Sequence, residues 1–359
     1  MNKVISIYPN NDPDYLKKCE EYISLAKQYS FQEIFTSIHL PEIDLDKQIE
    51  FLYQISILSK KYNMELIADI GGKSIKEIIS NDYFLNKLKD TNLDYLRLDY
   101  GYDHDDISYL SKVLNNKGFV INASIYNKED SIKEVEFIRS LYKEVKACHN
   151  FYPREESGVD KEFALSQKEI FNELSVPIYY CVPSQINPRG PIFKGLPTIE
   201  SHRYKPIDLI MLELINDYKA DGIMLSDNFY RKEDFAIIDS ICNKKEINIT
   251  AVIVNEEYSD IVYQTHEFRY DSNSNYLRSK SSRTMAEKGK EIEPYNCTIR
   301  SVGSITIDNK NYQRYSGELQ IVLNDNKADP RVNVVGYLQD VELEKLNYYR
   351  YGYKYIFTK

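Results

Sequence analysis

The chain of 359 residues is longer than one average domain, and 42% of its residues are hydrophobic, which is enough for a sizeable core. Its formal net charge of −9 excludes a protein whose main surface binds nucleic acid, because a phosphate backbone would be repelled on average. The five cysteines are scattered and never form C-x-x-C, which argues against a disulfide framework or structural zinc and fits a reducing cytosol: Cys19, Cys148, Cys181, Cys242 and Cys297.

The N-terminal stretch carries one short apolar run, VISIY (Val4–Tyr8), which ends at Pro9. This run is too short for a signal peptide. No later segment approaches the roughly 20 apolar residues that a transmembrane helix needs. We therefore expect a cytoplasmic protein without a membrane partner.

Short β-rich runs alternate with segments of helical periodicity from the start to about residue 230. Eight such units in this length predict a (β/α)8, or TIM, barrel. A doubly wound open sheet is the alternative, but it usually has fewer strands and often a Gly-rich phosphate turn, and the chain contains no G-x-G-x-x-G. The predicted strands are Val4–Tyr8, Glu33–Leu40, Glu65–Ile70, Tyr95–Tyr100, Phe119–Ile125, Glu144–His149, Val176–Val182 and Asp221–Asp227.

The segment after the seventh strand is unusually long and rich in proline and glycine (PSQINPRGPIFKGLPTIESHRYKP). A loop of this length inside a compact domain is usually functional or disordered, and its composition favours a rigid, ordered loop. The corresponding loop of barrels often binds phosphate, so its Arg189 and Arg203 are candidate anion ligands.

The pattern changes after about residue 230, where KKEINITAVIVNEEY and SITIDNKNYQRYSGELQIVL alternate apolar and polar residues as antiparallel strands do. IDNKNY predicts a hairpin turn around Asn309, and RVNVVGYLQDVELEKL predicts a strand and a short helix. We therefore expect a catalytic barrel over residues 1–234 and a smaller, mainly β domain over residues 235–359.

Three carboxylates are the best catalytic candidates, because side chains at the C-terminal ends of barrel strands converge on the active site. Asp69 and Asp99 each close an apolar strand, and Arg97 lies on the same face as Asp99 because strand residues two apart point the same way. Glu200 lies in the long loop. Structural roles remain open for all three. They are a helix cap or a salt bridge with Arg97 for the two aspartates, and capping of the next helix for Glu200. Paired carboxylates suit acid-catalysed cleavage of a glycosidic bond.

Metal and cysteine chemistry are weakly indicated. Only five histidines exist and none forms H-x-H or H-x-x-x-H, although His39, His149 and His202 fall near the expected mouth, so we expect neither metal nor cofactor. Cys148, at the end of the sixth strand, is better explained by packing than by nucleophilic catalysis.

Several distinctive segments resemble the bacterial 6-phospho-N-acetylmuramidases of the MupG type. They are ISIYP, IFTSIHL, LRLDYG, CHNFYPR, RGP with GLPTIESHR, and DGIMLSD, followed by YLRSKSSR, YSGELQI and DPRVNVVG. The resemblance spans essentially the whole chain. It implies a TIM barrel followed by a cyclophilin-like β domain.

The resemblance also implies hydrolysis of the β-1,4 bond of MurNAc 6-phosphate–GlcNAc during cytoplasmic recycling of peptidoglycan fragments. Asp69, Asp99 and Glu200 match acidic positions of the family motifs and become the expected catalytic residues. The expected partner is this anionic disaccharide, and a homodimer is left open. The residues expected to bind the substrate are Arg97, Asn122, His149, Asn150, Arg189, His202 and Arg203.

Three other functions remain open. Another sugar-phosphate barrel enzyme, such as a Schiff-base aldolase, needs a lysine at a strand end, and Lys146 lies two residues too early. A carbohydrate-binding protein would bind peptidoglycan fragments without turnover. A cyclophilin-like domain could carry prolyl isomerase activity, although a fold alone does not establish activity.

Overall fold

The computed structural model of the chain describes residues 1–10, 12, 14–271, 273–283 and 291–359. The described chain divides into two compact units, Met1–Ile238 and Asp239–Lys359.

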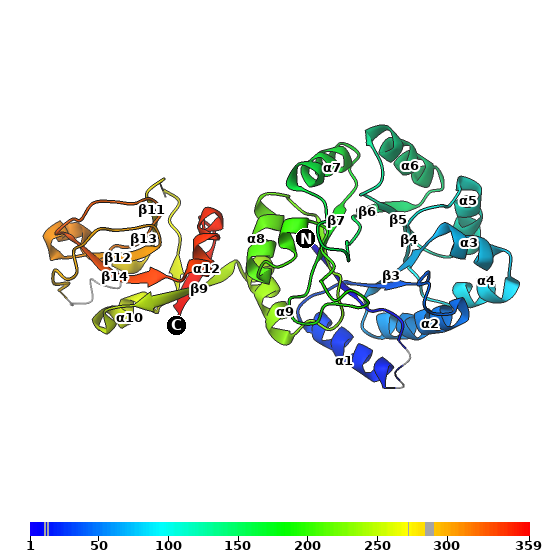
Figure 1. Cartoon of the computed structure of the whole chain (residues 1–359), viewed down its shortest axis with the longest axis horizontal. Coiled ribbons are helices and arrows are strands. Elements are labelled where there is room, and N and C mark those ends of the chain that lie inside the picture. Colours follow the sequence, from blue (N-terminus) through cyan, green and yellow to red (C-terminus); the bar gives the residue numbers. More distant parts are fainter. Residues whose placement is uncertain (11, 13, 272, 284–290) are drawn as a thin grey trace. The chain divides into compact units, whose positions relative to one another are not determined.

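The first unit is a closed barrel of eight parallel strands in the order β1 to β8, with β8 pairing back onto β1. Figure 1 shows the strands ringed by helices. The closed barrel confirms the predicted TIM-like fold and excludes the open sheet. The strands are β1 (Asn2–Ser6), β2 (Glu33–Ser37), β3 (Glu65–Ile70), β4 (Tyr95–Leu98), β5 (Gly118–Asn122), β6 (Glu144–Cys148), β7 (Ile178–Val182) and β8 (Gly222–Leu225).

Most helices that surround the barrel bury one face, and several begin at side-chain caps. Asp103, Asn127 and Asp160 each accept a hydrogen bond from a backbone N–H in the first turn of the helix that follows. The helices are α1 (Tyr15–Gln28), α2 (Leu45–Lys61), α3 (Gly72–Ile79), α4 (Asp82–Lys89), α5 (His104–Val113), α6 (Lys128–Ser140), α7 (Lys161–Glu173), α8 (Ile207–Asn216) and α9 (Lys232–Asp239).

The barrel interior is a layer of mainly apolar side chains, one or two from each strand or its immediate end: Val4, Tyr8, Phe35, Ile67, Tyr95, Val120, Cys148, Tyr179, Cys181 and Met224. Strand side chains alternate between inside and outside, so residues two further along also point inward. That step leads from Ile67 to Asp69, from Tyr95 to Arg97 and from Val120 to Asn122. Alternation therefore places a polar layer above the apolar one, at the C-terminal end of the barrel.

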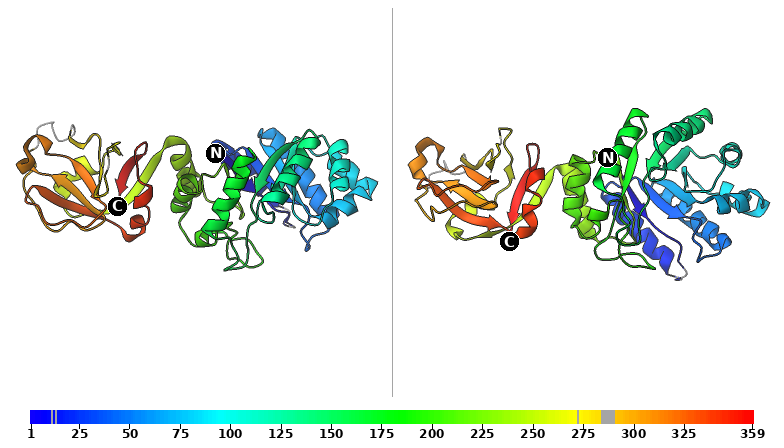
Figure 2. Two further views of the ribbon diagram at one scale, coloured as in Figure 1. Left: turned by 90° about the horizontal axis from the view of Figure 1, so that it is seen from above. Right: turned by 45° about the horizontal axis from the view of Figure 1, so that its top comes forward.

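The second unit is built on a seven-stranded sheet in the order β10-β15-β9-β14-β12-β13-β11. Figure 2 shows this sheet curled on itself. β15 pairs with β9 in parallel, and the other pairs are antiparallel. The strands are β9 (Glu246–Ile253), β10 (His266–Glu267), β11 (Tyr276–Arg278), β12 (Ser304–Asp308), β13 (Leu319–Val322), β14 (Val332–Leu338) and β15 (Lys354–Thr358).

The predicted hairpin at Asn309 is present, but its connection is longer than a simple turn. β12 and β13 do pair antiparallel, but residues 309–318 join them through the 3-10 segment Lys310–Tyr315. Asn309 caps this segment by accepting the backbone N–H of Asn311, which commits the chain to a helical turn. The predicted strand and short helix near the C-terminus are confirmed as β14 and α12 (Asp340–Leu343).

Short helices also occur in the second unit, at α10 (Ser259–Val262) and in the single turn Leu346–Tyr348. Within the described ranges, no helix has both the length and the apolar character needed to cross a bilayer.

Candidate active site

A cavity of about 1060 Å³ opens at the C-terminal ends of the barrel strands. Its polar lining includes Ser37, His39, Asp69, Arg97, Asp99, Asn122, Asn150 and Arg189. Apolar and aromatic groups complete the wall, among them Tyr8, Leu40, Tyr100, Ile125 and Phe151. This combination of convergent polar groups and aromatic walls is typical of a small-molecule site.

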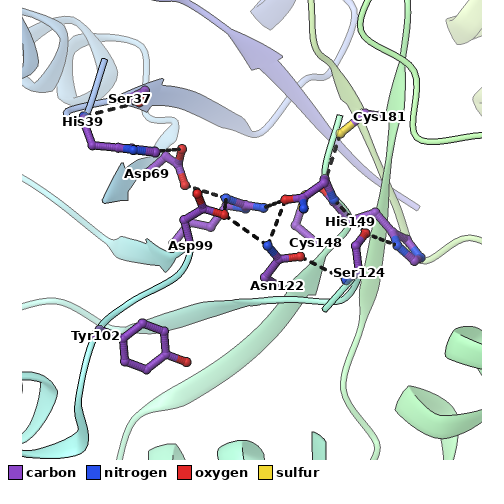
Figure 3. Close-up of polar contacts among 12 residues, drawn as sticks. Ser37, His39, Asp69, Asp99, Tyr102, Asn122, Ser124, Cys148, His149 and Cys181 are labelled. Atoms are coloured by element: carbon purple, nitrogen blue, oxygen red, sulfur yellow. Dashed lines mark hydrogen bonds and ion pairs between the residues drawn. The ribbon is translucent and has the colours of Figure 1, made fainter. Parts of the chain in front are cut away.

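Asp69 lies at the centre of the polar layer and has both carboxylate oxygens occupied. Arg97 Nη1 donates to Oδ1 at 2.6 Å, and His39 Nε2 lies 2.7 Å from Oδ2 (Figure 3). Burial alone would raise the pKa of Asp69, but the charge of Arg97 and the contact with His39 outweigh it and hold this pKa below its usual value. Asp69 is therefore an ionised carboxylate with little freedom to move.

Asp99 is the more accessible carboxylate, with 17% of its side chain exposed. Asn122 Nδ2 donates to Asp99 Oδ1 at 3.1 Å, and Arg97 Nη1 lies 3.5 Å from the same oxygen. In the described chain, no donor reaches the other oxygen, Oδ2. Asp99 therefore combines a fixed orientation with one carboxylate oxygen available to a substrate.

Asn150 joins the strand ends into one network. Its Oδ1 accepts from Arg97 Nη2 at 2.6 Å and from Asn122 Nδ2 at 2.8 Å. Arg97 is almost fully buried, and its charge is balanced by Asp69 and Asp99. Of the residues expected in the site, the structure brings together Asp69, Arg97, Asp99, Asn122 and Asn150.

Arg189 supplies positive charge to the cavity from the loop after β7. Its guanidinium carbon lies 3.8 Å from the centre of the Tyr8 ring, and Nη2 lies 3.9 Å from a carboxylate oxygen of Glu42. Its backbone N–H donates to the buried Asp227 at 2.7 Å. Asp227 also accepts the backbone N–H groups of Ser184 and Leu196, so one carboxylate shapes the loop that presents the guanidinium.

His149 does not reach the cavity, contrary to the expected contact with sugar hydroxyls. It follows Cys148, which faces the barrel interior, so strand alternation turns the imidazole outward. The ring is fully buried against Tyr180, and its Nδ1 pairs with the hydroxyl of Ser124 at 2.9 Å. Burial, aided by the charge of Arg97, lowers the pKa of His149 to about 3, so the imidazole is neutral.

Glu200 also lies outside the cavity lining, contrary to its expected catalytic role. Its carboxylate accepts the backbone N–H groups of Glu156 and Gly158 and two hydrogen bonds from Arg203. The bonds from Arg203, followed by those from the backbone, lower the pKa of Glu200 to about 2, despite the opposing effect of burial. A carboxylate with that pKa cannot donate a proton at neutral pH, so Glu200 instead fixes the loop.

Arg203 and His202 are likewise structural in this geometry. The buried Arg203 donates to Glu200 and to the carbonyl groups of Arg154, Lys194 and Gly195, which uses its donors within the loop. The buried His202 contacts Glu213 through Nε2 at 2.9 Å. Neither residue lines the cavity, so their expected contacts with the substrate are not supported.

Sequence reasoning did not assign a role to three residues of the site: His39, Tyr8 and Asp227. His39 and Tyr8 line the cavity just beyond the ends of β2 and β1, and Asp227 anchors the Arg189 loop. The sequence places Tyr8 at the end of the first predicted strand, and the inward alternation from Val4 indicates that it faces the barrel interior. Nothing in the sequence links Asp227 to a loop some forty residues earlier in the chain.

A metal centre has no counterpart in the described ranges, where no three His, Cys, Asp or Glu side chains come together as ligands.

The fold and the cavity define a barrel enzyme with carboxylates, amides and an arginine at the usual catalytic end. Residues 4–240 match the family description "6-phospho-N-acetylmuramidase, N-terminal", and residues 243–358 match "6-phospho-N-acetylmuramidase, C-terminal". The chain therefore belongs to the 6-phospho-N-acetylmuramidase family and is a glycosidase, which confirms the resemblance seen in its motifs.

Two solved structures are similar over essentially their whole length. A conserved protein of unknown function from Enterococcus faecalis has 25% identity and a TM-score of 0.80, covering 100% of this chain and 96% of its own. An uncharacterized B. cereus protein has 24% identity and a TM-score of 0.74, with coverages of 100% and 99%. No curated protein sequence matches the chain.

Proposed function

We propose that this glycosidase hydrolyses the β-1,4 bond of MurNAc 6-phosphate–GlcNAc, and that it does so in cytoplasmic recycling of peptidoglycan fragments. The observation that best supports the proposal is the placing of Asp69 and Asp99 beside Arg189 in one cavity. Carboxylates serve cleavage of a glycosidic bond, and an arginine serves recognition of an anionic sugar.

The two carboxylates suit a transition state that resembles an oxocarbenium ion. Asp99 presents its unpartnered oxygen Oδ2 to the cavity, where it would attack the anomeric carbon or activate a water molecule. Asp69 is held ionised by Arg97 and His39, so its charge favours positive charge developing on the sugar. Glu200 has no part in this scheme.

The amides and aromatic groups of the cavity suit the sugar rings. Asn122 and Asn150 are fixed by their mutual hydrogen bond and would contact sugar hydroxyls. The chain has no tryptophan, and Tyr100 and Phe151 line the cavity and would pack against sugar faces. Tyr8 is buried and stacks with Arg189 instead.

Arg189 is the proposed ligand of the 6-phosphate or of the lactyl carboxylate. Its stacking on Tyr8 and the bond from its backbone to Asp227 hold the guanidinium in place before a substrate arrives. Preorganisation of this kind lowers the entropic cost of binding. Replacing Arg189 by Met would raise KM for the phosphorylated disaccharide by roughly 10- to 100-fold, the range of a charged hydrogen bond, and would affect an unphosphorylated analogue less if the phosphate is its partner.

The decisive experiment incubates the purified chain with MurNAc 6-phosphate–GlcNAc and measures released GlcNAc by mass spectrometry. Release is expected for the wild type, and Asp99→Asn should abolish it. Asp105→Asn, at an exposed position of α5, serves as the matched control and should retain release. Absence of release by the wild type, or full turnover by Asp99→Asn, would reject the proposal.

A Schiff-base aldolase is disfavoured by the place of Lys146. Its Nζ lies 3.3 Å from Glu33 and 3.1 Å from Glu65, which begin β2 and β3. These contacts put the amine at the N-terminal end of the barrel, away from the cavity. Borohydride treatment with a sugar phosphate should therefore leave Lys146 unmodified.

Three further proposals concern the fold of the second unit, the domain boundary and the oligomeric state. The second unit would have a cyclophilin-like fold, and the boundary between the domains would lie near residue 234. The homodimer is tested by light scattering, and a protein that only binds sugars would show binding of the disaccharide without release of GlcNAc.

A further inference from the structure

We propose that His39 is the proton donor of this site and that Asp69 is the positioning residue that holds its imidazole. The inference rests on the proposed glycosidase function. It goes further by assigning the acid, a role that the scheme above gives to no residue.

Asp69 is excluded as the acid by its contacts. Each of its oxygens already has a partner, Arg97 on one side and His39 on the other, at 2.6 and 2.7 Å. A protonated Asp69 would lose its ion pair with the buried Arg97, which no solvent could replace. Asp69 therefore acts through His39.

Asp99 is better suited to act as the nucleophile or base than as the acid. Its Oδ1 is an acceptor for two donors, Asn122 and Arg97, and only Oδ2 is open to the cavity. A nucleophile or base needs such an oxygen with its lone pair available. If Asp99 takes this role, the leaving oxygen needs a proton from a different group.

His39 is placed to supply that proton. It lies just beyond the end of β2, lines the cavity and leaves 24% of its side chain exposed. Nε2 is bound to Asp69, whereas the described chain offers Nδ1 no hydrogen-bond partner. Figure 3 shows the imidazole extended toward Asp69. This is the arrangement of a proton-transfer group whose orientation is fixed by a carboxylate.

The charges around His39 favour the imidazolium form. Burial lowers its pKa, and so does the charge of Arg97 on β4, but the bond to Asp69 on β3 and the charges of Asp69 and Asp99 raise it. The balance places the pKa of His39 above its usual value. The contact with Asp69 therefore favours the form of His39 that carries a proton to donate.

Protons and electrons balance whether the reaction inverts or retains the configuration of the anomeric carbon. The glycosidic oxygen takes the proton of His39 together with the electron pair of the bond to the anomeric carbon. If Asp99 activates water, the hydroxyl joins that carbon and Asp99 keeps the proton until solvent removes it. If Asp99 forms an ester, neutral His39 takes a proton from the water that hydrolyses this ester and is restored directly.

The test compares two substrates with His39→Gln. On MurNAc 6-phosphate–GlcNAc, kcat should fall by roughly 10²- to 10⁴-fold, the usual contribution of general acid catalysis. On the 2,4-dinitrophenyl glycoside of MurNAc 6-phosphate, whose leaving group departs without protonation, formation of dinitrophenol should fall far less. His104→Gln is the matched control, since His104 lies on α5 outside the cavity lining and stacks on Phe137.

The pH profile gives a second readout that a structural role would not move. The basic limb of kcat/KM should disappear in His39→Gln, and in Asp69→Asn it should shift to lower pH. Equal losses on both substrates in His39→Gln would overturn the proposal. Glu77 also lines the cavity and is the other carboxylate that could donate a proton. A selective loss on the disaccharide in Asp99→Asn or Glu77→Gln would likewise overturn the proposal, because it would assign the acid to one of those carboxylates.

Failure of the proposed function is recognised separately. A wild type that cleaves neither substrate rejects the glycosidic reaction. NMR titration then still tests whether Asp69 is coupled to His39. His39 should titrate above its usual range in the wild type and lower in Asp69→Asn. A His39 signal that titrates identically in both proteins would reject the coupling.

Discussion

The two ends of the barrel both bury a cluster of opposite charges, and the cluster at the C-terminal end lines the cavity. At the N-terminal end, Lys146 lies between Glu33 and Glu65, and its ammonium is 3.7 Å from the centre of the Tyr95 ring. Glu33 also accepts from the hydroxyl of Tyr179 at 2.8 Å. The acids and the aromatic groups therefore enclose the amine.

At the C-terminal end, the cluster around Arg97 is left open. Asp99 keeps one oxygen without a donor from the described chain, and among the described carboxylates the guanidinium of Arg189 meets only Glu42, at 3.9 Å. The barrel thus uses similar ion pairs for two purposes. Where every partner comes from the chain the cluster supports the fold, and where partners are missing it is ready for a substrate.

Replacing Asp99 by Asn should have the largest effect. We expect kcat on the disaccharide to fall by about 10³-fold or more, equivalent to roughly 4 kcal/mol of transition-state stabilisation. The melting temperature should change little, because Asp99 is partly exposed and its contact with Arg97 is long. Kinetics and calorimetry on the same preparation check this, and a large loss of stability would place Asp99 with the structural cluster instead.

Replacing Lys146 by Met should lower stability without lowering activity, the reverse of what we expect for Asp99→Asn. It leaves the buried Glu33 without its counter-ion, which we expect to cost about 3–5 kcal/mol of unfolding free energy in urea. Turnover per folded molecule should be retained. Adding Glu33→Gln should recover part of the loss, because it removes the uncompensated charge, and Lys89→Met, at an exposed position of α4, is the control.

The sequence was sufficient for the barrel and for the inward-facing part of the site. Alternation along apolar strands places Asp69, Arg97 and Asn122 correctly, because their orientation depends only on a period of two. The same rule, applied from Cys148, would have turned His149 outward. The family motif nevertheless predicts that His149 contacts the substrate.

Glu200 and Arg203 show what the sequence could not provide. Their partners are backbone groups of two loops, and loop conformation has no period that can be read from residue types. Glu200 and Arg203 are residue types typical of active sites, but here they stabilise the conformation of the loops. His39 is the reverse case, since its role depends on a contact with the next strand's Asp69 that only the fold supplies.

The loop contacts predict a pH-dependent loss of stability. Because the pKa of Glu200 is lowered to about 2, its contribution is complete above the usual glutamate value near 4.3 and is lost as the pH falls toward 2. Glu200→Gln should therefore lower stability by about 1–2 kcal/mol at pH 7, and the gap should close between about pH 5 and pH 2.

Thermal unfolding across this pH range measures the gap. Glu169→Gln, at an exposed position of α7, serves as the control and should track the wild type throughout. A constant difference between Glu200→Gln and the wild type would mean that the loss comes from packing rather than from the charged hydrogen bonds.

The smallest change probes how closely the open cluster must be held. Gly71 has an extended backbone that any residue adopts, but a Cβ there would lie 3.2 Å from Nδ1 of His39. Gly71→Ala should therefore leave the barrel folded and displace the imidazole by a few tenths of an ångström. If His39 donates the proton, that displacement should lower kcat on the disaccharide by about three- to tenfold, which is roughly 1 kcal/mol. The dinitrophenyl glycoside should be cleaved at nearly the wild-type rate, since its departure needs no acid. Equal losses on the two substrates would instead mean that the methyl group obstructs the sugar itself. A catalytic role of the cluster at the C-terminal end would then rest on Asp99 alone.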